Sequence, residues 1–212
     1  VTVRICSWNV AAQSPQQLPR HQARKWLGFS ESEDNQNQRG GGAEDILLLS
    51  LQEIVDLNAR SLNGSSQSQA AMDQWIQFLS KTVMNSSDNY RLVHSSVMVG
   101  IGLAVFCRSG LKSSLSSVSE AAIKTGLGGL HGNKGGLVWR AFIFDCPVAF
   151  VAVHLAAGQS AVTERNTDLA TILRTASLAK DESRDFFAFP SGNDGSRIFD
   201  HSAVFVAGDM NY

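Results

Sequence analysis

The pattern of apolar and polar positions changes abruptly near the end of the chain. Residues 204–207 form an apolar run typical of a buried strand, and Gly208-Asp209-Met210-Asn211 follows directly. Because successive side chains of a strand point to opposite faces, Asp209 and Asn211 are predicted to share one face. Side by side, they could bind the same water, metal ion or phosphate oxygen. This strand end is the strongest indication of chemistry in the sequence.

Other stretches of the chain also have the pattern of strands. Residues 2–8 carry near-alternating β-type side chains and lead into Asn9, whereas residues 46–51 are apolar and run into Gln52 and Glu53. Gly or Pro interrupts β-rich runs around residues 99–102 and 144–147, which predicts two hairpins.

Two segments have the periodicity of helices. Within residues 68–84 the apolar positions recur at helical spacing, which predicts a surface helix with one core-facing stripe. A second helix is predicted over residues 161–179. Strands that outnumber helices and come in hairpins predict a layered α/β sandwich rather than an alternating doubly wound sheet.

The composition limits the class of protein. A chain of 212 residues with 43% hydrophobic residues suits one α/β domain. Its formal net charge of −1 provides no field that would argue for nucleic acid as a partner. The three cysteines, Cys6, Cys107 and Cys146, lie far apart without a metal-ligand spacing, which favours reduced thiols in a cytosolic protein.

Targeting and membrane segments are not predicted. The first ten residues have the pattern of a strand and not of a signal peptide. The longest apolar stretch, residues 46–51, is far too short to span a bilayer. Residues 30–45 are polar and rich in glycine, so we expect a flexible surface loop and assign no chemistry to it.

A glycine-rich segment stands in the middle of the chain. Residues 125–136 hold six glycines in twelve residues, together with Asn133 and Lys134. Such a loop lets backbone N–H groups approach an anion closely while Lys134 supplies positive charge. The spacing matches neither a Walker loop nor a dinucleotide-binding loop. An ordinary hairpin turn is the alternative interpretation.

Three acids and bases are ambiguous when each is taken alone. Glu53 at a strand end is more often solvated than a metal ligand. His154 interrupts an apolar strand, where a hydrogen-bonded core histidine is the alternative. Asp168 lies in the second predicted helix, where it could cap the helix or pair with Arg165.

The candidates indicate more when they are combined. Oxygen donors from Asn9, Glu53, Asp209 and Asn211 suit Mg²⁺, a hard cation that accepts few protein carboxylates and keeps several waters. Lys134 and His154 supply what a phosphoryl group requires. The combination predicts metal-assisted hydrolysis of a phosphoester.

These segments resemble, in order, the motifs of the inositol polyphosphate 5-phosphatases of the endonuclease/exonuclease/phosphatase superfamily. The resemblance extends over nearly the whole chain, and the form of the fourth motif is similar to that of synaptojanin-type members. The matching segments are Trp8-Asn9-Val10, Gln52-Glu53, the glycine-rich segment with Gly132-Asn133-Lys134-Gly135, His154-Leu155-Ala156-Ala157-Gly158-Gln159 with Arg165-Asn166, and Gly208-Asp209-Met210-Asn211-Tyr212.

The resemblance implies a fold and an activity. The fold is a four-layered α/β/β/α sandwich of the DNase I-like type, in which two facing mixed sheets are flanked by helices. The activity is Mg²⁺-dependent removal of the 5-phosphate from phosphoinositides or soluble inositol phosphates. Such a substrate places the protein in the cytoplasm, peripheral at membranes, with no nucleic acid partner and no transmembrane segment.

The resemblance also implies a role for each matching residue. Glu53 is the principal Mg²⁺ ligand, with Asn9 and Gln52 beside it. Asp209 orients or deprotonates the attacking water, whereas Asn211 and His154 contact the scissile phosphate. Asn133 and Lys134 hold ring phosphates, with Lys134 at the 4-position.

The sequence departs from the family pattern at its end. Family members continue with a Pro-Ala-Trp-x-Asp-Arg segment and later a Ser-Asp-His segment, and neither occurs in these residues. Asp200-His201 resembles the last pair in letters only, since it precedes the strand that carries Gly208. We therefore expect residues 1–212 to be the N-terminal portion, about two thirds, of a single catalytic domain, and to be inactive alone.

Two alternatives stay open at this point. One is a nuclease or deadenylase of the same superfamily, which would require a basic or aromatic strip for a polynucleotide. The other is a catalytically dead fragment that binds phosphoinositide or a protein.

Overall fold

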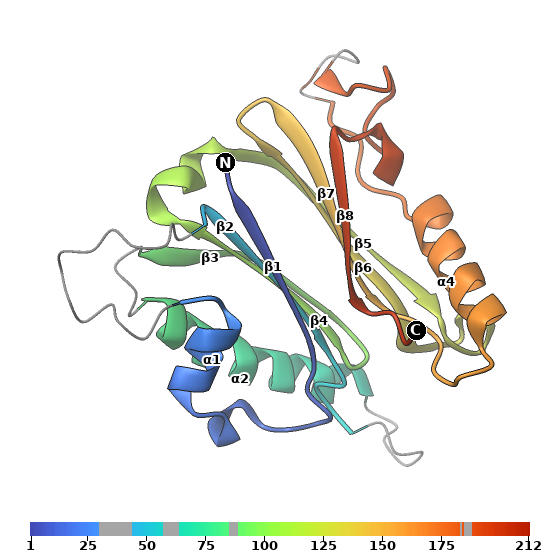
Figure 1. Ribbon diagram of the computed structural model, residues 1–212. Coiled ribbons are helices and arrows are strands. Elements are labelled where there is room, and N and C mark those ends of the chain that lie inside the picture. The colour runs from blue at the N-terminus through green and yellow to red at the C-terminus, as the bar shows by residue number, and fades with distance from the viewer. Residues whose placement is uncertain (30–43, 57–63, 85–88, 183, 185–187) are drawn as a thin grey trace.

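Two mixed β-sheets of four strands each face one another in the computed structural model (Figure 1). The structure describes residues 1–29, 44–56, 64–84, 89–182, 184 and 188–212. The first sheet has the order β1-β2-β4-β3, with β1 Val3–Asn9, β2 Ile46–Gln52, β3 Tyr90–Met98 and β4 Ile101–Arg108. The second has the order β5-β6-β7-β8, with β5 Leu115–Thr125, β6 His131–Ile143, β7 Cys146–His154 and β8 Ala203–Asp209.

Helices cover the outer faces of both sheets (Figure 1). Helices α1 (Arg20–Trp26) and α2 (Gly64–Met84) lie on the first sheet, and α4 (Val162–Thr175) lies on the second. The short helix α3 (Gly126–Gly129) joins β5 to β6, and three 3-10 helices complete the described elements: η1 Pro15–Gln17, η2 Ser109–Ser114 and η4 Ile198–Asp200. The predicted α/β/β/α sandwich is confirmed.

The core consists of three apolar layers. One lies between α2 and the first sheet, one between the two sheets, and one between α4 and the second sheet. Strand β2 shows why its sequence is apolar at almost every position: Leu47 and Leu49 contact the helical layer, whereas Ile46 and Leu48 contact the layer between the sheets. A strand that is buried on both faces cannot alternate apolar with polar residues.

Both predicted hairpins are confirmed, and a third connects β5 to β6. The predicted helix over residues 161–179 is too long, because α4 ends at Thr175. Beyond it the backbone is extended and bound to other segments: Leu178 N–H donates to the Ser196 carbonyl, and buried Arg140 donates to the Ala179 carbonyl. Tertiary hydrogen bonds thus end the helix where the local sequence would continue it.

The predicted loop over residues 30–45 falls mostly outside the described residues. Its last two residues are described, and both are bound to the N-terminal segment: Glu44 pairs with Arg4 of β1, and the Asp45 carboxylate accepts a hydrogen bond of 2.8 Å from the N–H of Thr2, which precedes β1. No helix within the described ranges has the length and apolar character needed to cross a membrane.

Two glycines allow neighbouring strands of the second sheet to approach closely. Gly135 has φ +144° and Gly208 has φ +145°. A Cβ atom on Gly135 would lie 2.0 Å from the Ile123 carbonyl oxygen, and one on Gly208 would lie 1.9 Å from the Val153 carbonyl oxygen. Each glycine adjoins a candidate site residue, Lys134 or Asp209, so strand spacing and site geometry are set at the same points.

We expect Gly208→Ala to push β8 away from β7 and to displace Asp209. The clash is with backbone rather than with a flexible side chain, so the free energy of unfolding should fall by about 1–3 kcal/mol or more. Urea denaturation measures the loss. Gly110→Ala is the control, because a Cβ there meets no atom within 4 Å. Equal stability of the two variants would contradict the account.

His201 makes stability depend on pH. Burial lowers its pKa from the ordinary value of 6.5, and the charge of Arg140 adds to this effect, whereas backbone carbonyls and Asp200 oppose it. Its Nδ1 donates to the carbonyls of Arg197 and Ile198 at 3.1 and 2.9 Å, so the proton of the neutral ring lies on Nδ1.

The folded state should therefore lose stability as the pH falls below about 6.5, because the unfolded chain then binds a proton that the folded chain resists. Each pH unit below that value should cost up to about 1.4 kcal/mol at this group until its folded pKa is reached. His201→Gln should reduce the slope of unfolding free energy against pH between about 7.5 and 5.5, and the slope that remains comes in part from His94 and His154, whose pKa values burial also lowers. The exposed His21→Gln should leave the slope unchanged, and an equal slope in both variants would refute this role.

Candidate active site

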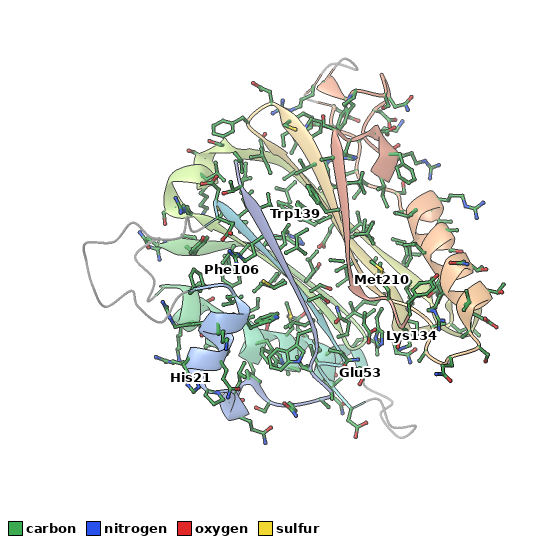
Figure 2. All side chains as sticks on the ribbon, viewed as in Figure 1. His21, Glu53, Phe106, Lys134, Trp139 and Met210 are labelled. Carbon is green, nitrogen blue, oxygen red and sulfur yellow. The ribbon has the colours of Figure 1, made fainter. Side chains whose placement is uncertain are left out.

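Four strands end together at one edge of the sandwich. Asn9 ends β1 and is paired in register with Gln52, which ends β2, and His154 ends β7 opposite Asp209, which ends β8. Both pairs of strands are parallel, so each pair delivers its last residues to the same sheet edge. Figure 2 shows Glu53 and Lys134 at this end of the molecule, far from the labelled core residue Trp139.

A hydrogen bond joins the two sheets at this edge. The side-chain amide of Asn9 donates to Asp209 Oδ2 at 2.9 Å, although the two residues are 200 positions apart. The amide oxygen of Asn9 and the second carboxylate oxygen of Asp209 each accept a backbone N–H: Asn9 Oδ1 from Ala11 at 3.1 Å and Asp209 Oδ1 from Asn211 at 3.0 Å. Both side chains are thus held in fixed orientations.

His154 lies between the charged residues of the two sheets. It is 2% exposed, and its Nε2 atom lies 2.5 Å from Lys134 Nζ, 3.7 Å from Asp209 Oδ2 and 3.8 Å from Glu53 Oε1. Burial lowers the pKa of His154 to about 4, with a further contribution from Lys134, and the two carboxylates oppose the shift only in part. The ring is therefore neutral at pH 7, and its contacts with the carboxylates are not ion pairs.

The ammonium group of Lys134 can only donate, so Nε2 of His154 accepts and the ring proton lies on Nδ1. Burial also lowers the pKa of Lys134, whereas the negative charges of Glu53, Asp209 and Asp168 oppose this shift. One cation thus faces three carboxylates, and two of these, Glu53 and Asp209, also lie near the neutral imidazole.

A cavity of about 740 Å³ opens beside Lys134. Its walls come from the glycine-rich turn, including Asn133, from Ala156 and Ala157 after β7, and from the face of α4 that carries Thr163, Thr167 and Thr171. The glycine-rich segment is a hairpin turn between β5 and β6, as the alternative interpretation expects, and it also lines a cavity next to a lysine; anion binding by this segment stays a prediction.

The predicted arrangement of Asn211 is wrong in its geometry. Strand β8 ends at Asp209, and Asn211 lies beyond it with φ +56°. The alternation of a strand therefore cannot place the two side chains on one face. Instead Asn211 donates its backbone N–H to Asp209 and its side-chain amide to the Leu155 carbonyl at 2.9 Å. The two residues are neighbours through a turn, and Asn211 also fixes the segment that follows His154.

Gln52 is directed into the protein. It is fully buried, its amide donates to Ser50 Oγ at 2.7 Å, and its Oε1 accepts from Ser7 Oγ at 3.4 Å. The structure therefore brings Gln52 next to Asn9 in the sheet, but occupies its amide with two serines.

The oxygen donors at the strand ends fit a hard cation. The Glu53 side chain is 43% exposed, and its carboxylate and that of Asp209 approach the same nitrogen of His154 from different sheets. No three His, Cys, Asp or Glu side chains of the described ranges form a metal-binding group. Mg²⁺ is usually bound by one or two protein carboxylates and several waters, and not by a cage made of protein ligands alone. Glu53, with Asn9 and Asp209 beside it, suits this mode of binding.

Two residues of α4 have contacts that the sequence did not predict. Asp168 neither caps the helix nor pairs with Arg165 in the structure: its Oδ2 accepts the Ala156 N–H at 3.1 Å. Arg165 is 3% exposed and donates to the carbonyls of Gly158 at 2.6 Å and Ala156 at 3.4 Å. The cavity-facing threonines were also missed, although their spacing of four residues is the signature of one helix face.

Comparison with known proteins gives consistent results. The model of endonuclease/exonuclease/phosphatase family 2 matches residues 6–212. A probable inositol polyphosphate 5-phosphatase of Schizosaccharomyces pombe is 38% identical over 231 residues, which cover 100% of this chain and 19% of that protein. Human synaptojanin-1 is 35% identical over 191 residues, which cover 90% of this chain and 11% of that protein. The chain thus spans less than a fifth of these relatives.

A solved structure agrees with the fold. The inositol polyphosphate 5-phosphatase domain of SPsynaptojanin, crystallised with inositol (1,4)-bisphosphate and a calcium ion, superposes with a TM-score of 0.75 at 26% identity. The match covers 100% of this chain and 53% of that one. The chain therefore belongs to endonuclease/exonuclease/phosphatase family 2, and its relatives there include inositol polyphosphate 5-phosphatases and synaptojanins.

Proposed function

We propose that this protein removes the 5-phosphate from phosphoinositides or soluble inositol phosphates with the help of Mg²⁺. One observation carries the proposal: the carboxylates of Glu53, which follows β2, and of Asp209, which ends β8, flank neutral His154 and Lys134, and Lys134 lines a cavity of about 740 Å³. The names of the relatives and the inositol bisphosphate bound by the similar domain support this choice of substrate.

Glu53 is the main protein ligand for the metal, with Asn9 beside it. Gln52 supports the ends of β1 and β2 from the interior through its hydrogen bonds to Ser7 and Ser50. The carboxylate is partly exposed, so it can share the ion with water and substrate. When bound there, Mg²⁺ polarises the phosphate and stabilises negative charge on the leaving oxygen.

Asp209 orients the attacking water and accepts its proton. Asn9 and Asn211 each use one lone pair of its two oxygens, which leaves acceptor capacity on both. The same two contacts fix the carboxylate in position, so little reorganisation is needed when the water is bound. Asp209 therefore combines a defined orientation with a free acceptor site.

His154 and Asn211 contact the scissile phosphate. Asn211 uses one amide hydrogen on the Leu155 carbonyl and keeps a second that can donate to a phosphate oxygen. His154 is neutral and buried, so it brings a dipole without adding charge to a site that already holds a lysine.

Asn133 and Lys134 hold ring phosphates, with Lys134 on the 4-phosphate. Both line the cavity, and the Lys134 ammonium group lies 2.5 Å from Nε2 of His154. Because the lipid form of the substrate resides in a bilayer, we place the protein in the cytoplasm as a peripheral protein of membrane surfaces.

The proposal is tested by following product formation from inositol 1,4,5-trisphosphate with a protein that contains this chain within a complete catalytic domain, because residues 1–212 are expected to be inactive alone. We expect release of inorganic phosphate with Mg²⁺ and none after chelation by EDTA, with inositol 1,4-bisphosphate as the organic product. Single-stranded RNA and DNA should not be cleaved. Cleavage of a polynucleotide would favour a nuclease, and binding of the inositide without turnover would favour a non-catalytic binding protein.

Glu53→Gln should abolish most Mg²⁺-dependent activity and leave the fold intact. Loss of a metal-binding charge removes several kcal/mol of transition-state stabilisation, which corresponds to a fall of about 10²–10³-fold in kcat/KM at limiting Mg²⁺. Phosphate release against Mg²⁺ concentration measures the effect, and Glu182→Gln, an exposed acid outside this site, is the control. Near-normal turnover at limiting Mg²⁺ would remove Glu53 from the metal site.

Lys134→Ala should discriminate between substrates. A hydrogen bond between charged partners contributes about 1.5–3 kcal/mol, so kcat/KM should fall by roughly 10–150-fold for inositides that carry a 4-phosphate. Substrates without this phosphate should lose less, and comparison of the two substrate classes measures the difference. Equal losses would place Lys134 on the scissile phosphate, which its contact with His154 also permits.

A further inference from the structure

The segment that follows His154 links the proposed catalytic groups to α4. Leu155 is buried, and its N–H donates to the Asp209 carbonyl at 3.0 Å. Ala156 and Ala157 then form part of the cavity wall. A shift of this segment would therefore move both His154 and the surface that meets the substrate.

Helix α4 holds this segment by both polar groups of one residue. The Ala156 N–H donates to Asp168 Oδ2 at 3.1 Å, and the Ala156 carbonyl accepts from Arg165 Nη1 at 3.4 Å. The same Nη1 donates to the Gly158 carbonyl at 2.6 Å. Asp168 and Arg165 are three residues apart, so they lie on one face of the helix.

Arg165 is itself held in place. Its side chain is almost completely buried, and the ring of Tyr212 lies 4.7 Å from its guanidinium carbon. The Tyr212 hydroxyl in turn bonds to Asn166 Oδ1. A planar guanidinium fixed by a ring and two carbonyls has few other orientations available, so it acts as a rigid support rather than as a solvated surface charge.

We propose that Asp168 and Arg165 are positioning residues for this site, which act by fixing the backbone of residues 156–158 and, through it, His154 and the cavity wall. This inference rests on the proposed function. It gives a specific role to two residues to which the family resemblance assigned none. Catalytic groups must be held within a fraction of an ångström, because a displacement of about 1 Å can cost about 10²-fold in rate.

Asp168 has a second property from which the positioning role must be separated. Its charge is close enough to Lys134 to oppose the lowering of the lysine pKa by burial. Asp168→Asn removes this charge but keeps an oxygen that can accept the Ala156 N–H. Asp168→Ala removes both, so the two variants distinguish the hydrogen bond from the charge.

The test combines hydrogen exchange with kinetics. In Asp168→Ala the backbone amides of residues 155–158 should exchange at least about tenfold faster, because local opening becomes easier. For the same variant kcat should fall by about 30–100-fold, with KM changed by less than about threefold, since His154 at the scissile phosphate is displaced, whereas Asn133 and Lys134, the proposed contacts of the ring phosphates, belong to another segment. Asp168→Asn should restore both quantities to within about threefold of the wild type.

Arg165→Lys provides a second variant that does not depend on Asp168. It keeps the charge but loses the fixed fork of donors, and it should raise exchange in the same segment and lower kcat. Arg174→Lys on the same helix and Asp73→Ala on α2 are matched controls, because their side chains bond to groups outside this segment. Both controls should behave as the wild type.

Unchanged exchange at residues 155–158 in both Asp168→Ala and Arg165→Lys would overturn the inference. Equal losses of kcat in Asp168→Asn and Asp168→Ala would also overturn it, because the charge near Lys134 would then be responsible. A wild-type protein without phosphatase activity would refute the proposed function alone, since the exchange measurement decides the positioning role without turnover.

Discussion

The hydrogen bond between Asn9 and Asp209 is the contact on which the arrangement of the site depends. It joins β1 to β8, the edge strands of two different sheets, at the level where both strands end. Glu53 directly follows β2 of the first sheet, whereas Lys134, His154 and Asp209 belong to the second. The apolar layer between the sheets holds them together without fixing the polar groups at their rim, because hydrophobic contact is not directional. A directed hydrogen bond supplies that orientation.

Electrostatic balance explains how these charges can share one edge. Two carboxylates and one ammonium group surround His154. Burial lowers the pKa of the ring to about 4, so the imidazole is neutral. Excess negative charge at the rim suits a divalent cation, and Lys134 beside it suits a phosphate. The same groups that would repel one another in an empty site thus become complementary to a metal and an anionic substrate.

Most of the fold, and the main site residues, could be predicted from sequence because apolar strands deliver polar residues at their ends. That rule led to Asn9, Glu53, His154 and Asp209, which the structure brings to one edge. It failed for Asn211, where the strand stops two residues earlier and a turn replaces alternation. It could not predict the contacts of Asp168 and Arg165, because their partners are backbone groups of another segment, which carry no sequence pattern. The role of Gly208 likewise depends on a neighbouring strand that only the fold supplies.

The coupling of the two sheets through Asn9 and Asp209 is tested most directly by a double-mutant cycle in phosphate release, with Asn9→Ala, Asp209→Ala and the double variant. If the amide acts by orienting the carboxylate, the loss of Asn9 should matter less once Asp209 is absent, and the loss that remains measures the place of Asn9 beside the metal. We predict that Asn9→Ala slows Asp209→Ala by a factor at least about five times smaller than it slows the wild type, which is a coupling free energy of about 1 kcal/mol or more. Losses that simply multiply, with no coupling free energy, would contradict the account.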